Sequence, residues 1–358
     1  MGDMVEQYKN IISRMYYVAN GEVLNDNELE RLLKEHKCFY LLSKTNPRMA
    51  SIDVAINRAC GSLLYEECDE IFEQLNSIPY VIMKGCVLSK SIYGDEGYRS
   101  IGDIDILVSP KHIEYVDEVL SRGGFVQGTI IEGDVQEYNR SEKIFHRAFT
   151  HQLASYIKKT NRRLLPVINI DINIDLLWGE SDLNINIDEY LQHTQTVSVF
   201  NKSVNKLEPI YEFIALCLHH YKDLNSVYLI YKHGLKLSLF SDIYYYVKNA
   251  KLDSKEMYKV AQELGVSKFI YYCLFYTNVI FDDEIISKFL DECIESRDEF
   301  MLNSYGLSDN EKTTWNLSFE SRLFGKNFFD AFVDGLTSSV KEKIQLNEKY
   351  LLRKKESI

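Results

Sequence analysis

Two aspartates separated by a single isoleucine, Asp103 and Asp105, stand at the start of an apolar run. In a β-strand, side chains two residues apart lie on the same face, so both carboxylates would point one way while Ile104 points into a core. Neighbouring negative charges are costly unless a cation lies between them. The pair therefore indicates a site for a hard divalent cation such as Mg²⁺. Because an exposed pair on a strand needs no such cation, other residues must support this interpretation.

A Lys-Gly turn lies one element upstream of the aspartates. The apolar run 80–83 ends at Lys84 and Gly85, and a helical pattern continues from Cys86. Helix N termini bind phosphate through their unpaired N–H groups, and glycine allows a close approach to the backbone. Lys84 and Arg99 could add positive charge on either side of a triphosphate, although ordinary exposed side chains are the alternative for both. Together these residues predict a phosphate-binding turn near the aspartates.

A third carboxylate is available on a later strand. Residues 167–178 alternate isoleucine with asparagine or aspartate, as in a strand with one buried and one polar face. Asp171 and Asp175 share the polar face, about 13 Å apart in an extended strand, so they cannot both bind the same ions. Three converging carboxylates would hold two Mg²⁺ ions, which activate an attacking hydroxyl and neutralise a leaving pyrophosphate.

The hydrophobic pattern predicts the elements that must position these residues. Strands are expected at 80–83, 104–108, from 125 and at 167–178, with 149–158 as a further candidate, and helices at 86–93 and 111–121. Helices are also expected at 4–20, 26–45 and 50–75, and from 207 to the end, where the last spans 324–350. We expect an α+β fold: a small mixed β-sheet flanked by helices, with an all-helical C-terminal region. The regions would be 1–78, 79–200 and 201–358.

Composition limits the functional classes. The 358 residues carry a net charge of −12 and no long basic run, so tight binding to bulk nucleic acid is not expected, while a local basic patch for one RNA stays open. Seven scattered cysteines form no Cys-x-x-Cys pair, which favours reduced thiols over disulfides or structural zinc. There is no apolar run of about 18 to 20 residues and no signal-peptide pattern at the start, so we expect no membrane span and a cytoplasmic location.

The order of these elements resembles the nucleotidyltransferase fold of the DNA polymerase β-like superfamily. A poorly characterised bacterial branch of it is similar in three stretches: Met83-Lys84-Gly85, Gly97-Tyr98-Arg99 and Asp103-Ile104-Asp105. That branch carries its third acid in an acid-Leu-His-Trp stretch, which Asp175-Leu176-Leu177-Trp178 matches with Leu177 in place of the histidine. The resemblance thus implies that Asp175 is the third metal ligand, with Asp171 the second choice. It also implies that Lys84, Gly85, Cys86 and Arg99 bind the nucleotide.

The resemblance continues into the helical region, in the stretches 216–222 and 236–243. From the helical region, His219 and His220 could reach the nucleotide or its phosphates, and Asp242 could contact the substrate. Histidines 219 and 220 could equally be structural, and Asp242 could instead pair with Lys236 or His220. His146 and His151, which precede the acidic strand, are weaker candidates for the site.

These observations predict a Mg²⁺-dependent nucleotidyltransferase. An NTP would bind at Lys84-Gly85 with two Mg²⁺ ions held by Asp103, Asp105 and Asp175, and an acceptor hydroxyl or phosphate would attack the α-phosphorus. Asp175 would lie nearest the attacking oxygen. The net acidity favours a small molecule or a peptide as acceptor. Three alternatives stay open: a toxin-type enzyme that modifies tRNA or protein, a phosphotransferase, and a non-catalytic nucleotide-binding module.

Overall fold

The computed structural model describes residues 2–179, 181–309 and 312–351. Contacts within the chain divide it into two compact units, each built from separate segments. The sheet unit contains Ala55–Glu212 and residues 343–351, and the helical unit contains residues 2–54 and Phe213–Glu342. The N-terminal residues thus belong with the C-terminal helices, a grouping that differs from the three consecutive regions expected from the sequence.

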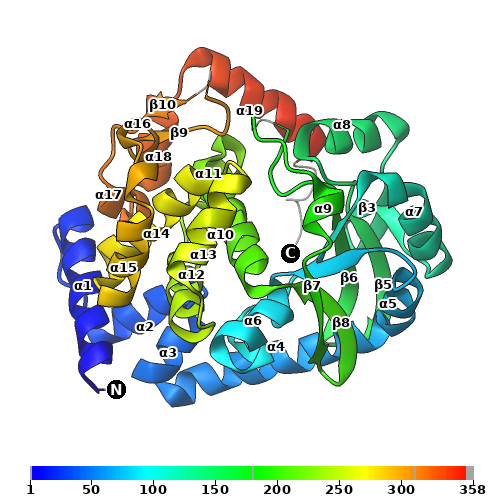
Figure 1. Cartoon of the computed structure of the whole chain (residues 1–358), viewed down its shortest axis with the longest axis horizontal. Helices are drawn as coiled ribbons and strands as arrows, with labels where there is room; N and C mark the ends of the chain where they lie inside the picture. Colours follow the sequence, from blue (N-terminus) through cyan, green and yellow to red (C-terminus); the bar gives the residue numbers. More distant parts are fainter. Residues whose placement is uncertain (1, 180, 310–311, 352–358) are drawn as a thin grey trace. The chain divides into compact units, whose positions relative to one another are not determined.

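A six-stranded mixed sheet forms the centre of the sheet unit, in the order β1-β2-β6-β5-β3-β4. Figure 1 labels its strands β3, β5 and β6. Strand β2 runs antiparallel to β1 and parallel to β6, and the remaining pairs are antiparallel. The mixed sheet and the α+β class confirm the predicted fold. The strands are β1 (Tyr80–Met83), β2 (Ile104–Val108), β3 (Val126–Ile131), β4 (Asp134–Glu137), β5 (Tyr156–Arg162) and β6 (Leu165–Asn173).

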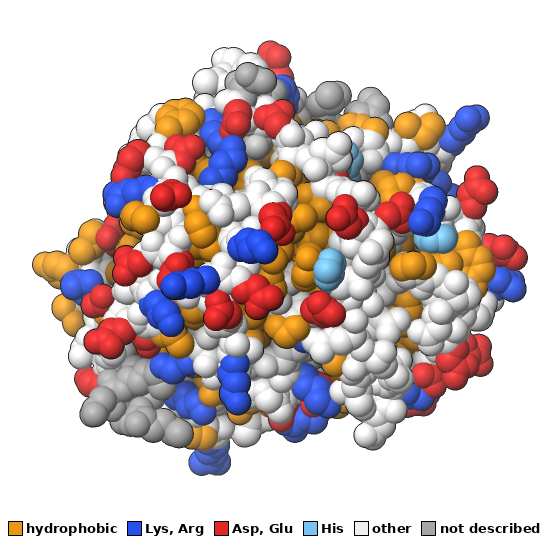
Figure 2. Space-filling model, in the orientation of Figure 1, with side chains coloured by type: hydrophobic (Ala, Val, Ile, Leu, Met, Phe, Trp, Pro, Cys, Tyr) orange, Lys and Arg blue, Asp and Glu red, His pale blue; other side chains and the backbone are white. Residues whose placement is uncertain are grey.

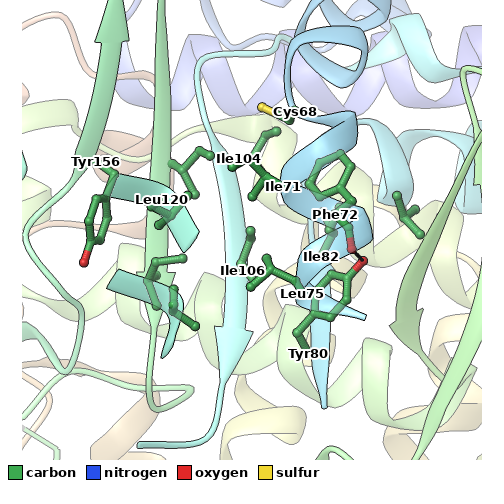
Figure 3. Packing of buried hydrophobic residues seen from close by; sticks show 14 of the residues in the cluster. Cys68, Ile71, Phe72, Leu75, Tyr80, Ile82, Ile104, Ile106, Leu120 and Tyr156 are labelled. Atoms are coloured by element: carbon green, nitrogen blue, oxygen red, sulfur yellow. Dashed lines mark hydrogen bonds between the residues drawn. The ribbon is translucent and has the colours of Figure 1, made fainter. Parts of the chain in front are cut away.

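One face of β2 and β6 builds the core of this unit. Ile104 and Ile106 of β2 are buried and point toward the apolar side of helix α5 (Asp69–Leu75), as Figure 3 shows. The alternating isoleucines of β6 are fully buried in the same cluster. Burying each such side chain contributes roughly 1.5–3 kcal/mol, so the alternation fixes which face of each strand turns inward. The opposite face of both strands therefore carries the polar residues.

Helices and a hairpin complete the sheet unit. The hairpin of β7 (Thr194–Val199) and β8 (Lys202–Leu207), which the sequence did not predict, packs with β8 against β1. The predicted strand at 149–158 is corrected: a helix ends at Thr150 and β5 begins only at Tyr156. The other elements are α4 (Pro47–Glu67), α6 (Gly85–Tyr93), η1 (Glu96–Tyr98), η2 (Pro110–His112), α7 (Ile113–Arg122), α8 (Arg140–Thr150) and α9 (Ile187–Tyr190).

The helical unit contains most of the remaining helices. These are α1 (Gly2–Asn20), α2 (Asp26–Glu35), α3 (Phe39–Thr45), α11 (Val227–His233), α12 (Leu237–Asn249), α13 (Ser254–Glu263), α14 (Ser267–Phe281), α15 (Glu284–Glu292), η3 (Ile294–Ser296), α16 (Glu299–Leu302), α17 (Phe319–Phe324) and α18 (Phe328–Gly335). Helices α4, α10 (Pro209–Asn225) and α19 (Ser338–Leu351) each continue from one unit into the other.

Several predicted helices are shorter than expected. The segment 26–45 breaks where Lys37 adopts a left-handed conformation with φ of 57°, and 50–75 breaks at Cys68. The expected helix 324–350 is instead the end of α17 followed by α18 and α19. Two short antiparallel strands, β9 (Ser304–Tyr305) and β10 (Thr313–Thr314), interrupt the otherwise helical C-terminal region. Across the described part of the chain, no helix combines the length and apolar character needed to cross a membrane.

Candidate active site

The turn between β1 and α6 has an unusual backbone. Lys84 has φ of 59° and ψ of −148°, a conformation that residues other than glycine adopt at a cost of about 1–3 kcal/mol. Gly85 follows with φ of 49°, and an added Cβ there would meet no atom within 4 Å. Such strain persists only where the surroundings hold it, and it is common at functional sites. The turn therefore exposes the start of α6 beside open space.

Lys84 directs its side chain to Asp105. The antiparallel register pairs Met83 with Asp105, which brings the next residue of the turn alongside the carboxylate. Lys84 Nζ lies 2.8 Å from Asp105 Oδ2, and the two side chains are 15% and 12% exposed. At this exposure both charges are partly removed from water. Replacing either side chain by a neutral one would therefore destabilise the remaining charge.

The second oxygen of Asp105 is held from strand β6. Asn173 Nδ2 donates a hydrogen bond to Asp105 Oδ1 at 3.3 Å, and the Gln152 side-chain amide donates to Asn173 Oδ1. Asp171 pairs directly with Asp105 in the parallel register, so their backbones lie about 5 Å apart. Of the two candidates for a third carboxylate, Asp171 is thus the direct neighbour of Asp105.

Asp175 lies beyond the end of β6 and has other partners. Its Oδ2 lies 2.9 Å from His151 Nδ1, and its Oδ1 accepts a hydrogen bond of 2.6 Å from the backbone N–H of Leu176. Burial raises the pKa of the Asp175 carboxyl, although these hydrogen bonds act in the opposite direction. Asp175 is thus half of an Asp–His pair, and its role as the third metal ligand stays a prediction.

Asp103 and Cys86, two further residues predicted from the sequence, lie in different environments. Asp103 is exposed just before β2, next to Gly102, where an added Cβ would meet nothing within 4 Å. Cys86 is buried in the core, and burial raises the pKa of its thiol to about 12 despite the nearby positive charge of Arg99. The thiol is thus protonated at neutral pH, and only the backbone N–H of Cys86 is suited to an anion.

The oxygen donors suit Mg²⁺, but they do not form a closed protein cage. Within residues 2–179, 181–309 and 312–351, no three Asp, Glu, His or Cys side chains are grouped so that they could hold a metal ion. Mg²⁺ commonly takes one or two carboxylates and completes its shell with substrate phosphates and water. Asp103 and Asp105, with Asp171 beside them, fit that mode of binding.

His219 and Asp242 belong to the helical unit. Asp242 is 2% exposed, and its Oδ2 lies 3.5 Å from Nε2 of His220, which is completely buried. Of the two partners left open from the sequence, His220 is thus the one beside it. His219 Nε2 lies 3.2 Å from Asp223 Oδ2 one turn along the same helix. These contacts give Asp242 a structural partner inside the helical unit, and the proposed nucleotide contact of either residue stays a prediction.

Two residues of the site were not predicted from the sequence. Asn173 lies on the polar face of the predicted strand between Asp171 and Asp175, so the alternation was a usable signal. Gln152 has no comparable signal, because its isolated pairing with Asn173 becomes visible only once β6 and the segment after α8 are placed. Both residues position Asp105 through side-chain hydrogen bonds.

Comparison with known proteins identifies the family. The profile of a family described as uncharacterised nucleotidyltransferase matches residues 29–282. The chain belongs to this nucleotidyltransferase family. The matched range includes Lys84, Asp103, Asp105, Asp171 and Asp175 and extends into the helical unit, which confirms the resemblance noted in the sequence.

The chain was also compared with curated proteins and with solved structures. No match is found among curated proteins. Among solved structures, the chain is similar to an antigenic nucleotidyltransferase-like protein from Paracoccidioides brasiliensis, with 15% sequence identity and a TM-score of 0.36. That similarity covers 68% of this chain and 94% of the other.

Proposed function

We propose that this nucleotidyltransferase transfers a nucleoside monophosphate from an NTP to an acceptor and releases pyrophosphate. The proposal is carried by the Lys84–Asp105 pair at the start of α6. It places an ammonium group and a helix N terminus, both suited to phosphate, beside a carboxylate suited to a divalent cation. Membership of the family supports the same reaction class.

The residues of this chain would have two tasks, which are to bind the triphosphate and to hold Mg²⁺. The first turn of α6 and Lys84 would bind the triphosphate, and Arg99 would add positive charge. Asp103 and Asp105, with Asp171 as the nearest further carboxylate, would hold Mg²⁺. When bound, the ions neutralise the triphosphate and the leaving pyrophosphate. Asn173 would keep the Asp105 carboxylate oriented while Lys84 exchanges its carboxylate partner for a phosphate oxygen.

A small molecule or a peptide in the cytoplasm is the acceptor class that we favour. On the face drawn in Figure 2, Lys and Arg side chains lie among Asp and Glu side chains, and the net charge is −12. Binding to long nucleic acid depends on phosphate neutralisation by clustered basic residues. The mixed charge of this face and the negative net charge therefore support a short acceptor.

The test incubates the protein with Mg²⁺, a cell extract and each of the four NTPs labelled at the α-phosphate. We expect pyrophosphate release and label transfer for the wild type, and a loss of at least about 100-fold in Asp105→Asn. Asp134→Asn, on the far edge strand β4, is the matched control and should retain full activity. Transfer from a γ-labelled NTP instead would show phosphotransfer and contradict the proposal.

Fractionating the extract identifies the acceptor class. Label in the metabolite or peptide fraction is the expected result, whereas label in tRNA or intact protein would favour a toxin-type enzyme. Nucleotide binding without transfer, equal in the wild type and Asp105→Asn, would indicate a binding module.

A further inference from the structure

Helix α4 holds the segment that leads from α6 to β2. Asn57 Nδ2 donates a hydrogen bond of 3.1 Å to the carbonyl oxygen of Gly97, and Arg58 Nη2 forms an ion pair with Asp95 Oδ2. Gly61 follows one turn after Asn57, so it lies on the same side of the helix. Asn57, Arg58 and Gly61 together form what we call the α4 contact face.

Gly61 leaves room for the end of this segment. An added Cβ at Gly61 would lie 2.5 Å from Ile101 Cδ1 and 2.7 Å from a ring carbon of Phe200. Gly61 lies inside a helix, where glycine is less stable than alanine and the backbone does not require it. The close approach of Ile101 and Phe200 therefore explains the glycine at this position.

Asp95 and the neighbouring helix α6 fix the middle of the segment. Asp95 caps η1, because its Oδ1 accepts a hydrogen bond of 2.8 Å from the Gly97 N–H. Ser89 Oγ of α6 donates to the carbonyl oxygen of Asp95 at 2.6 Å, and Lys90 Nζ lies 2.9 Å from a carboxylate oxygen of Glu96. The short helix η1 is thus held by α4 and α6 together.

This arrangement fixes where Arg99 begins. Arg99 follows η1 directly in extended backbone, with φ of −113° and ψ of 142°. Further along, Asp105 pairs with Met83, so β2 begins beside the Lys-Gly turn. Burial raises the pKa of the Cys86 thiol to about 12, and the charge of Arg99 acts in the opposite direction. Because such an effect weakens with distance, the guanidinium lies near the first turn of α6.

We propose that the α4 contact face positions Arg99 for binding the triphosphate, so that Asn57 and Gly61 set the affinity for NTP without touching it. The inference rests on the proposed function and deepens it, because it identifies the part of the fold that governs substrate binding at the same site. Releasing Gly97 from Asn57, or pushing Ile101 away from Gly61, lets Arg99 move from the start of α6. Asn57 and Gly61 are therefore positioning residues.

The first test measures the dissociation constants of the α,β-imido analogues of the four NTPs, with Mg²⁺, by calorimetry. Asn57→Ala and Gly61→Ala should each weaken binding by about 10-fold, part of the effect of losing one hydrogen bond to a charged group. Asp95→Asn still accepts from the Gly97 N–H, so it should stay within about 3-fold of the wild type. Glu66→Ala, which removes a different ion pair of α4 (with Arg162), is the matched control and should bind like the wild type.

A double-mutant cycle separates positioning from a general loss of stability. Arg99→Ala should weaken binding by itself. Adding Asn57→Ala or Gly61→Ala to it should cause no further loss, because a displaced arginine and an absent one leave the same contact unmade. In the α-label assay, Asn57→Ala and Gly61→Ala should raise KM and leave kcat within about 3-fold of the wild type, since uniform substrate binding is what they weaken.

The outcomes distinguish the inference from the proposed function. Wild-type affinity in both Asn57→Ala and Gly61→Ala, with weaker binding in Arg99→Ala, would overturn the inference and leave the nucleotidyltransferase intact. Additive losses in the double variants, or unchanged binding in Arg99→Ala, would also overturn it. No transfer by the wild type, or full activity in Asp105→Asn, would instead contradict the proposed function.

Discussion

At the scale of single residues, Lys84 brings together backbone strain and charge. Its φ and ψ fall in a region that suits glycine, and its ammonium group is paired with a carboxylate that is mostly buried. A glycine would adopt this backbone without strain, but it could supply no charge. The strained lysine is therefore best explained by the anions around it: Asp105 in this structure and, in our proposal, the triphosphate of the substrate.

This strain predicts an unusual order of stability for two variants. Lys84→Gly and Lys84→Ala both lose the ion pair, but only alanine keeps the backbone strain. We expect Lys84→Gly to have the higher free energy of unfolding, by about 1 kcal/mol after the greater flexibility of unfolded glycine is deducted. Urea denaturation of the two variants measures the difference. Equal stability, or a more stable alanine variant, would show that the turn is not strained.

At the scale of elements, the pairing of β2 with β6 decides which side chains meet. The periodicity of both strands was predictable because isoleucine alternates with polar residues. The residue opposite Asp105 could not be predicted, because a strand's own sequence does not set its register against a neighbouring strand. The predicted third ligand, Asp175, followed the resemblance, whereas the register places Asp171 beside Asp105. The β7–β8 hairpin was missed because its strands are rich in polar, partly exposed residues.

A buried histidine joins two helices of the other unit and predicts a pH effect. His36, at the end of α2, accepts a hydrogen bond of 2.9 Å from the N–H of Leu237 at the start of α12. Burial, assisted by the charge of Lys236, lowers the pKa of His36 from 6.5 to about 3. The folded state thus binds fewer protons than the unfolded state between these values, so stability is complete above pH 6.5 and is lost as the pH falls.

Denaturation of the wild type and His36→Asn across this pH range measures the effect. Asparagine can still accept the Leu237 hydrogen bond but does not titrate, so the wild type should lose a few kcal/mol relative to it on acidification, on the order of 1.4 kcal/mol per pH unit. A constant difference between the two proteins would contradict the assignment.

At the scale of the whole molecule, each unit is assembled from segments distant in the sequence. Hydrophobic patterning identified the N-terminal helices but could not show that they pack with α14 and α17, because patterning reports a buried face and not its partner. The uncharacterised nucleotidyltransferase profile spans parts of both units, since it covers residues 29–282. The match is therefore not confined to the sheet unit.

This assembly predicts where a core defect will spread. Ile12 of α1 is fully buried, so Ile12→Ala should cost about 2–5 kcal/mol and expose the helices packed on α1. Hydrogen exchange should accelerate in α14 and α17 while β2 and β6 keep their protection. Val18→Ala, at a position of the same helix that is 59% exposed, is the matched control and should change little. Equal acceleration in β2 and β6 would mean that the two units open as one.

The most direct test of the central claim is label transfer from α-labelled NTPs by the wild type and Asp105→Asn, with Asp134→Asn as control. We predict transfer with stoichiometric pyrophosphate release by the wild type and the control, and a loss of at least about 100-fold in Asp105→Asn. Equal transfer by the wild type and Asp105→Asn would contradict the assignment of the site around Lys84 and Asp105.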